Sequence, residues 1–80
     1  MQLISPDEFD VDLVERRVTH RASGIWFSFY EYLDEDDWHK SDSVTYRDNP
    51  TWEGDRNLLA TSAKNAAMAK GMTARRPVVA

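Results

Sequence analysis

Residues 25–33, Ile-Trp-Phe-Ser-Phe-Tyr-Glu-Tyr-Leu, are the most strongly β-prone stretch of the sequence. Aromatic and β-branched side chains favour strands, and successive side chains of a strand point to opposite faces. The alternation predicts a core face formed by Ile25, Phe27, Phe29 and Leu33. The opposite face would carry Trp26, Ser28, Tyr30 and Tyr32. We therefore expect one strand over 25–33, with one face in the core and the other open.

Two further strands are expected on either side of this stretch. Ser5-Pro6-Asp7-Glu8 has a cap, a proline and an acid in the order that begins a helix, so it predicts one helical turn before a strand near 11–21. The polar run 34–37 predicts a turn, after which residues 38–47 are rich in Ser, Thr, Val and Tyr and predict a third strand. Short connections favour antiparallel pairing of all three strands.

A helix is expected from about residue 55 to residue 74, capped by Thr51 or Asp55. The expected fold is thus α+β: a three-stranded antiparallel sheet, one C-terminal helix packed on one face, and a short N-terminal helical turn. Residues 1–80 would form a single domain. The predicted core consists of Ile25, Phe27, Phe29, Leu33, Val44, Leu58, Leu59, Ala63 and Ala66.

Composition and charge exclude several classes of protein. The 80 residues contain no cysteine, which removes disulfides and thiolate chemistry. No apolar run is long enough to cross a membrane, and Met1-Gln-Leu-Ile-Ser-Pro lacks the features of a secretory signal, so we expect a cytoplasmic protein. Residues 1–55 hold fourteen acids against five bases, a net charge of −9, whereas residues 56–80 hold five bases and no acid. Arg16, Arg17 and Arg21, with Trp26 and Tyr30, could form a cationic and aromatic surface for nucleic acid. The acidic majority argues against such direct binding without excluding it.

No motif of catalysis or metal binding is present. The glycines, at 24, 54 and 71, are too few for a phosphate-binding loop. His20 and His39 have no zinc spacing and are expected to be polar residues at the sheet edge. Counted from Asp34, the sixth and twelfth positions of a calcium loop would be His39 and Thr45, which cannot serve. We expect neither an enzyme nor a cofactor.

The acidic run and the open aromatic face are the strongest candidates for function. A charge run is most often a solvated surface, but this one could also meet a basic patch on a partner protein. Exposed aromatic side chains would supply anchors, and a second copy of the chain, forming a homodimer, is an alternative cover for them. The candidate partner-binding residues are Trp26, Tyr30, Glu31, Tyr32, Asp34, Glu35, Asp36 and Asp37.

The sequence shows two resemblances to known proteins, and the first concerns the order of its expected elements. The order of Arg16 to Arg21, Gly24-Ile25-Trp26-Phe27, Trp38 to Arg47 and Leu58 to Met72 resembles the β-β-β-α DNA-binding domains of phage integrases. Ser62-Ala63-Lys64-Asn65-Ala66-Ala67 is similar to the second helix of double-stranded RNA-binding domains. These likenesses imply a nucleic-acid-binding module of phage or mobile-element origin.

The second resemblance is one of size and charge. A small acidic chain with an acidic segment at 31–37, aromatic strands and no active site resembles the inhibitors that phages encode against bacterial defence systems, including anti-CRISPR proteins. It implies an inhibitor that occupies a basic or nucleic-acid-binding surface of its target.

Overall fold

The computed structural model describes residues 2–41 and 45–76. In chain order the elements are a 3₁₀ turn η1 (Pro6–Glu8), strands β1 (Phe9–Asp12), β2 (Arg17–His20) and β3 (Trp26–Ser28), helix α1 (Glu35–Lys40), strand β4 (Thr45–Arg47) and helix α2 (Arg56–Ala69). The α+β class, the antiparallel sheet, the opening helical turn and the C-terminal helix are confirmed. The sheet has four strands, however, and not three.

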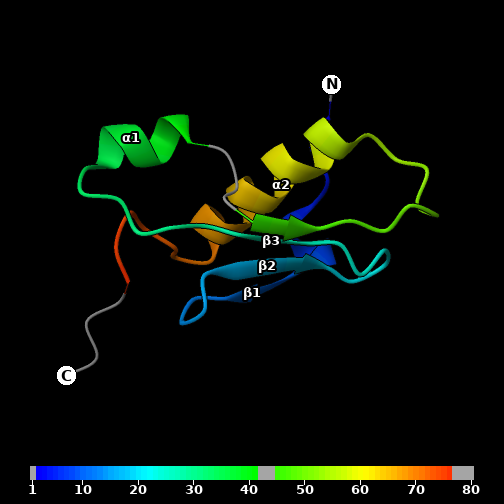
Figure 1. The fold of residues 1–80 in the computed structure, drawn as a ribbon, viewed down its shortest axis with the longest axis horizontal. Helices are drawn as coiled ribbons and strands as arrows, with labels where there is room; N and C mark the ends of the chain where they lie inside the picture. The colour runs from blue at the N-terminus through cyan, green and yellow to red at the C-terminus, as the bar shows by residue number, and fades with distance from the viewer. Residues whose placement is uncertain (1, 42–44, 77–80) are drawn as a thin grey trace.

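The four strands form an antiparallel sheet in the order β1-β2-β3-β4. Val18 of β2 lies opposite Val11 of β1 and Phe27 of β3, and Phe27 in turn lies opposite Tyr46 of β4. Val18 and Phe27 are buried, and α2 packs along the face that they form (Figure 1). No helix formed by residues 2–41 or 45–76 covers the other face of the sheet (Figure 1).

The single strand predicted near 11–21 is wrong, because the chain makes a hairpin there. The Asp12 carboxylate accepts hydrogen bonds from the backbone N–H groups of Val14 and Glu15, each at 3.0 Å, which folds the chain into a turn. Arg16 then adopts a left-handed backbone with φ of 55°, and β2 runs back along β1. The run of valines that suggested one strand is therefore divided between two.

The strand predicted over 38–47 is also wrong at its start, because residues 38–40 are helical, and only Thr45–Arg47 of the described residues pair as a strand. Asp34, expected in a turn, is the N-cap of α1, and its carboxylate accepts from the Asp37 N–H at 2.8 Å. Acids fill the first turn of α1 and His39 and Lys40 fill the last, which suits the helix dipole. The strand predicted over 25–33 is likewise shorter, since only Trp26–Ser28 pair as β3.

Helix α2 follows its N-cap Asp55, one of the two predicted caps, and ends at Ala69 with Lys70 as its C-cap. Gly71 has φ of 102°, the Met72 N–H donates to the Ala67 carbonyl at 2.9 Å, and the Gly71 N–H donates to the Met68 carbonyl at 3.1 Å. These two bonds form a Schellman motif, which satisfies the last carbonyls of the helix. The helix therefore stops before residue 74, the predicted end.

The core follows the prediction in most but not all positions. Ile25, Phe27, Phe29, Leu59, Ala63 and Ala66 are buried as expected. Leu33 is not: its side chain is 88% exposed, because β3 has ended and the chain has left the sheet. Leu58 is only half-buried, and Val44 lies outside the described residues. Phe9, Val18, Trp38, Ala67, Met72 and Ala74 complete the core.

Candidate functional site

Trp38 fixes α1 to the body of the molecule. Its side chain is 1% exposed and its ring meets Phe29 edge-on, with ring centroids 5.7 Å apart. The Lys64 ammonium of α2 lies 4.7 Å from the Trp38 ring centre and donates to the carbonyls of Trp38 and Ser41 at the end of α1. A cation at this position stabilises the negative end of the helix dipole. The buried Trp38 ring and the Lys64 ammonium at the C-terminal end of α1 therefore hold this six-residue helix in place.

Arg16 is a buried charge that also lies against the Trp38 ring. Its Nε and Nη2 donate to the carbonyls of Phe29 and Tyr30, both at 3.0 Å, and its guanidinium lies 5.1 Å from the Trp38 ring centre. Burial lowers the pKa of Arg16, while the Glu31 carboxylate acts to raise it. Arg16 therefore belongs to the interior, and the surface role considered for it in nucleic-acid binding is excluded.

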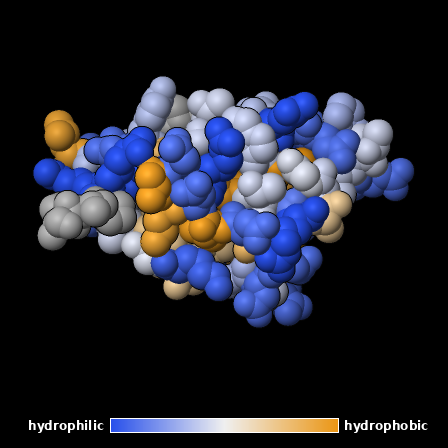
Figure 2. Space-filling view, turned by 90° about the horizontal axis from the view of Figure 1, so that it is seen from below, coloured by the Kyte–Doolittle hydropathy of each residue, from blue (hydrophilic) through white to orange (hydrophobic). Residues whose placement is uncertain are grey.

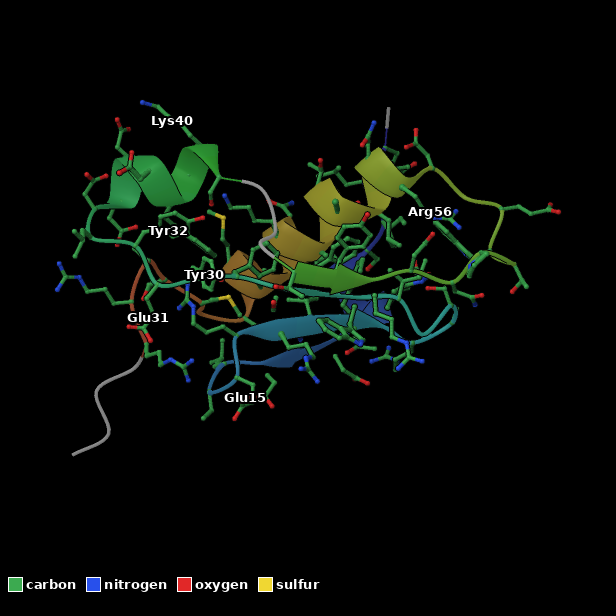
Figure 3. The ribbon with its side chains drawn as sticks, in the orientation of Figure 1. Glu15, Tyr30, Glu31, Tyr32, Lys40 and Arg56 are labelled. Atoms are coloured by element: carbon green, nitrogen blue, oxygen red, sulfur yellow. The ribbon has the colours of Figure 1, made fainter. Side chains whose placement is uncertain are left out.

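The segment that joins β3 to α1 is pinned along its backbone. Besides the bonds from Arg16, the Tyr32 N–H donates to the Ala74 carbonyl at 2.7 Å, and Arg75 donates to the Leu33 carbonyl at 2.9 Å. Tyr30 and Leu33 nevertheless point outward, with 64% and 88% of their surface exposed. In Figure 3, Tyr30, Glu31 and Tyr32 follow one another below α1. The side chains of Tyr30 and Leu33 are therefore exposed, while the backbone of their segment is fixed by hydrogen bonds.

The predicted acidic residues lie around the start of α1, and their charges are only partly compensated. Lys40 pairs with Asp36 at 2.9 Å, and His39 lies 3.9 Å from Glu35. Asp34 caps the helix, and Asp37 has no charged side-chain partner among the described residues. We call the surface formed by Tyr30, Glu31, Leu33, Asp34, Glu35, Asp36 and Asp37 the acidic end.

The other predicted binding residues do not all join the acidic end. Tyr32 is half-buried and packs on Trp38, with ring centroids 6.1 Å apart. Trp26 lies on the open face of the sheet, where the Arg17 guanidinium stacks on its ring at 4.1 Å. The structure therefore divides the predicted site in two, and Leu33 takes the place of Trp26 as a neighbour of the carboxylates. The position of Leu33, directly before the acidic N-cap Asp34, could have indicated that the strand had ended. The alternation of residues 25–33 instead assigned Leu33 to the core.

The basic C-terminal region folds back onto the acidic body. Arg76 pairs with Glu31 and donates to the Val14 carbonyl. Arg56 pairs with Asp48 at 2.8 Å and lies over the ring of Trp52, 4.9 Å from its centre. The separation of charge along the sequence is therefore reduced in the folded molecule.

His20 and Ser23 form the one close pair of a histidine and a serine among the described residues. His20 Nδ1 lies 2.7 Å from Ser23 Oγ, and His20 Nε2 lies 3.7 Å from a Glu8 carboxylate oxygen. Both residues are buried, and Ser23 Oγ also accepts from the Ile25 N–H at 3.2 Å. The Trp52 ring packs on the imidazole, with centroids 5.6 Å apart. The cluster stabilises the turn before β3. The expectation of two histidines at the sheet edge is wrong for both, because His20 is buried and His39 lies in helix α1.

An open hollow of about 500 Å³ lies beside β1. Its lining combines apolar side chains with two basic residues, Arg21 and Lys70, and two aspartates. Arg21 is already bonded to Asp10, at 2.9 Å. Figure 2, which views the molecule from below, shows apolar side chains reaching a mostly hydrophilic surface. Mixed charges and an open shape select no class of ligand. The lining residues are Asp7, Phe9, Asp10, Val11, Leu13, Arg21 and Lys70.

The described parts of the chain contain neither a cluster of metal-binding side chains nor a membrane-spanning helix. Residues 2–41 and 45–76 contain no group of three acids or histidines that could hold a metal ion. No helix in these ranges is long and apolar enough to cross a membrane.

No protein-family model, no curated protein and no solved structure matched the chain. The function must therefore be argued from the geometry of the acidic end and of the sheet.

Proposed function

We propose that the protein is a non-enzymatic binding module whose acidic end docks on a basic surface of a partner protein. The observation that carries this proposal is the exposed Leu33 side chain, which directly precedes the N-cap and the acidic first turn of α1. An apolar anchor surrounded by charge is the usual composition of a binding surface, in which the anchor supplies affinity and the charges guide the approach.

The fixed backbone of the acidic end supports the proposal. Hydrogen bonds from Arg16 and Arg75 hold the carbonyls of Tyr30 and Leu33, so the anchors need little ordering when a partner arrives. Preorganisation of this kind lowers the entropic cost of association. Burying a leucine side chain contributes about 1.5–3 kcal/mol, which is enough to make Leu33 the dominant single contact.

The charge of this surface indicates the nature of the partner. Residues 34–40 carry four acids and one lysine, a net charge of −3. Carboxylates compete with phosphates for the same arginine and lysine side chains. A basic surface occupied in this way would often be one that binds nucleic acid, and the protein would then act as its inhibitor. The likeness to phage inhibitors of the anti-CRISPR type leads to the same proposal, with the cytoplasm as its setting.

A second copy of the chain is a poorer occupant of the acidic end. A two-fold interface places the same patch of both copies together, so carboxylate would face carboxylate. Like charges brought together at an interface cost several kcal/mol. We therefore propose a different protein, rather than homodimerisation, at this surface.

The test compares three variants as bait in a nuclease-treated host lysate, with mass spectrometry of what is retained. Leu33→Ser removes the anchor, and Glu35→Gln with Asp37→Asn removes two charges without touching the cap Asp34. Glu15→Gln with Glu53→Gln is the control, because it removes two exposed charges elsewhere.

A true partner is retained by the wild type and the control, is lost with Leu33→Ser, and binds the Glu35/Asp37 variant with a slower association rate. The purified partner should also lose its nucleic-acid binding when the protein is added. Equal retention by all variants would exclude the acidic end as the binding surface.

A further inference from the structure

The open face of the sheet has a character opposite to that of the acidic end. Side chains on this face come from alternate positions of each strand. Thr19 lies opposite Trp26, which lies opposite Arg47. In the next row Arg17 lies opposite Ser28, which lies opposite Thr45. We call the part of this face over β2, β3 and β4 the basic face. It consists of Arg17, Thr19, Trp26, Ser28, Thr45 and Arg47.

The two arginines of the basic face are exposed and have no carboxylate partner among the residues that the structure describes. Arg17 stacks on the half-buried Trp26 at 4.1 Å, and Arg47 stands directly across from Trp26 on β4. No acid lies on these positions of β2, β3 and β4. The acids of this side of the sheet are on β1, where Asp10 pairs with Arg21 and Asp12 accepts hydrogen bonds from the hairpin turn.

We infer that the basic face binds single-stranded nucleic acid. Guanidinium groups without a carboxylate partner neutralise phosphates, and the half-buried Trp26 ring with Arg17 stacked on it offers a planar platform on which an unpaired base can stack. The hydroxyls of Thr19 and Thr45 flank this platform and can donate to phosphate or sugar oxygens. Unpaired bases are required, because bases within a duplex are already stacked and their faces are hidden.

The net charge of −4 does not oppose this inference at short range. Charges are screened over about 8 Å at physiological salt. The molecule is 40 Å long, and α1, which carries the largest group of acids, lies at one end of it (Figure 1). A phosphate over β3 and β4 therefore meets Arg17 and Arg47 first. Asp10 and Asp12, which lie opposite Thr19 and Arg17 on β1, are engaged with Arg21 and with the hairpin turn.

The corrected set of residues differs from that suggested by the sequence. Arg16 is buried, Arg21 is paired with Asp10, and Tyr30 lies beyond the end of β3, so these three residues do not contribute. Arg47 replaces them, because β4 brings it beside Trp26. Binding of nucleic acid by the basic face does not depend on the acidic end. Either this inference or the proposed partner binding can therefore be wrong while the other holds.

Fluorescence anisotropy with a short labelled oligothymidylate tests the inference, at salt concentrations from about 20 to 200 mM. We expect a dissociation constant of about 10⁻⁴–10⁻⁶ M at low salt, the range of binding dominated by phosphate contacts. Two phosphate contacts on a single strand give a slope of about −1.4 for the logarithm of affinity against that of salt. Arg17→Gln with Arg47→Gln should flatten this slope and lower the affinity at least tenfold.

Trp26→Ala should lower the affinity roughly 5- to 150-fold, the loss of one stacked base, whereas Trp26→Phe should retain most of it. Lys40→Gln with Lys70→Gln is the control, because it removes two exposed charges outside the face and should change the affinity by less than about twofold. Circular dichroism checks that each variant is folded. The acidic-end variant Glu35→Gln with Asp37→Asn should bind the oligonucleotide as the wild type does.

Three results would overturn the inference. The first is no binding of the oligonucleotide at about 100 μM protein and low salt, the weak limit of non-specific association. The second is an equal affinity in the Arg17/Arg47 variant and in the lysine control. The third is binding of polyglutamate in place of the oligonucleotide, with the same dependence on Arg17 and Arg47, which would assign the face to an acidic protein.

Discussion

Replacing Arg16 by alanine and by glycine separates the role of its side chain from that of its backbone. The Arg16 side chain is 1% exposed, holds two carbonyls and lies against Trp38, while its backbone is in the left-handed region with φ of 55°. Alanine removes the side chain and keeps the backbone strain. Glycine removes both.

The expected magnitudes follow from these contacts. A hydrogen bond from a charged donor contributes about 1.5–3 kcal/mol, so two of them contribute about 3–6 kcal/mol. Part of this is offset in the native protein, because the charge is buried and Nη1 has no partner. We expect Arg16→Ala to cost about 3 kcal/mol. Arg16→Gly should cost about 1 kcal/mol less than Arg16→Ala, since glycine adopts a positive φ without strain.

Urea denaturation followed by tryptophan fluorescence measures both variants. With a slope near 1 kcal/mol per molar, a loss of about 3 kcal/mol lowers the midpoint by about 3 M. A chain of this size has only about 3–5 kcal/mol of stability, so sodium sulfate is added to all samples to bring the variants into range. The reasoning is refuted if Arg16→Ala lies within about 0.5 kcal/mol of the wild type, or if it is more stable than Arg16→Gly.

Three further predictions concern packing and capping. Ala63→Leu should cost about 1–3 kcal/mol and lower the melting temperature, because Ala63 is fully buried on the inner face of α2; an unchanged melting temperature would contradict its burial. Gly54→Ala should displace the Trp52 ring, since the added Cβ would lie 2.1 Å from a ring carbon, and unchanged tryptophan fluorescence and stability would count against this close contact. Asp34→Ala should cost about 1 kcal/mol through the loss of the N-cap, with faster amide exchange in α1 but not in α2. Uniform loss of protection in both helices would show that α1 does not unfold separately.

Periodicity predicted the parts of the fold in which burial decides the structure. Phe27 and Phe29 were placed in the core by alternation, and Ala63 and Ala66 by helical spacing, and all four are buried. The prediction was wrong where single side chains redirect the backbone. Asp12 made a hairpin out of an expected strand, and Asp34 made a helix out of an expected turn. Such caps act over three or four residues and leave no periodic trace.

The candidate site was predictable in composition but not in arrangement. The carboxylates of residues 34–37 were identified correctly as an exposed group. Leu33 was assigned to the core because its alternation assumed that the strand continued past Ser28. Arg47 could not be grouped with Trp26 before the register of β4 was known. Side chains brought together by strand pairing are distant in sequence, so their grouping depends on tertiary structure.

The anchoring of residues 30–33 by residues 74–76 sets the order in which the acidic end can be completed during synthesis. Arg75 and Leu33 are 42 positions apart, and Arg76 and Glu31 are 45 positions apart. Contacts of such separation close late in folding. While the ribosome still holds residues 74–76, Tyr30 and Leu33 have a backbone that is only partly fixed. The backbone of the acidic end therefore becomes fully fixed only after residues 74–76 have been synthesised and have packed against residues 30–33.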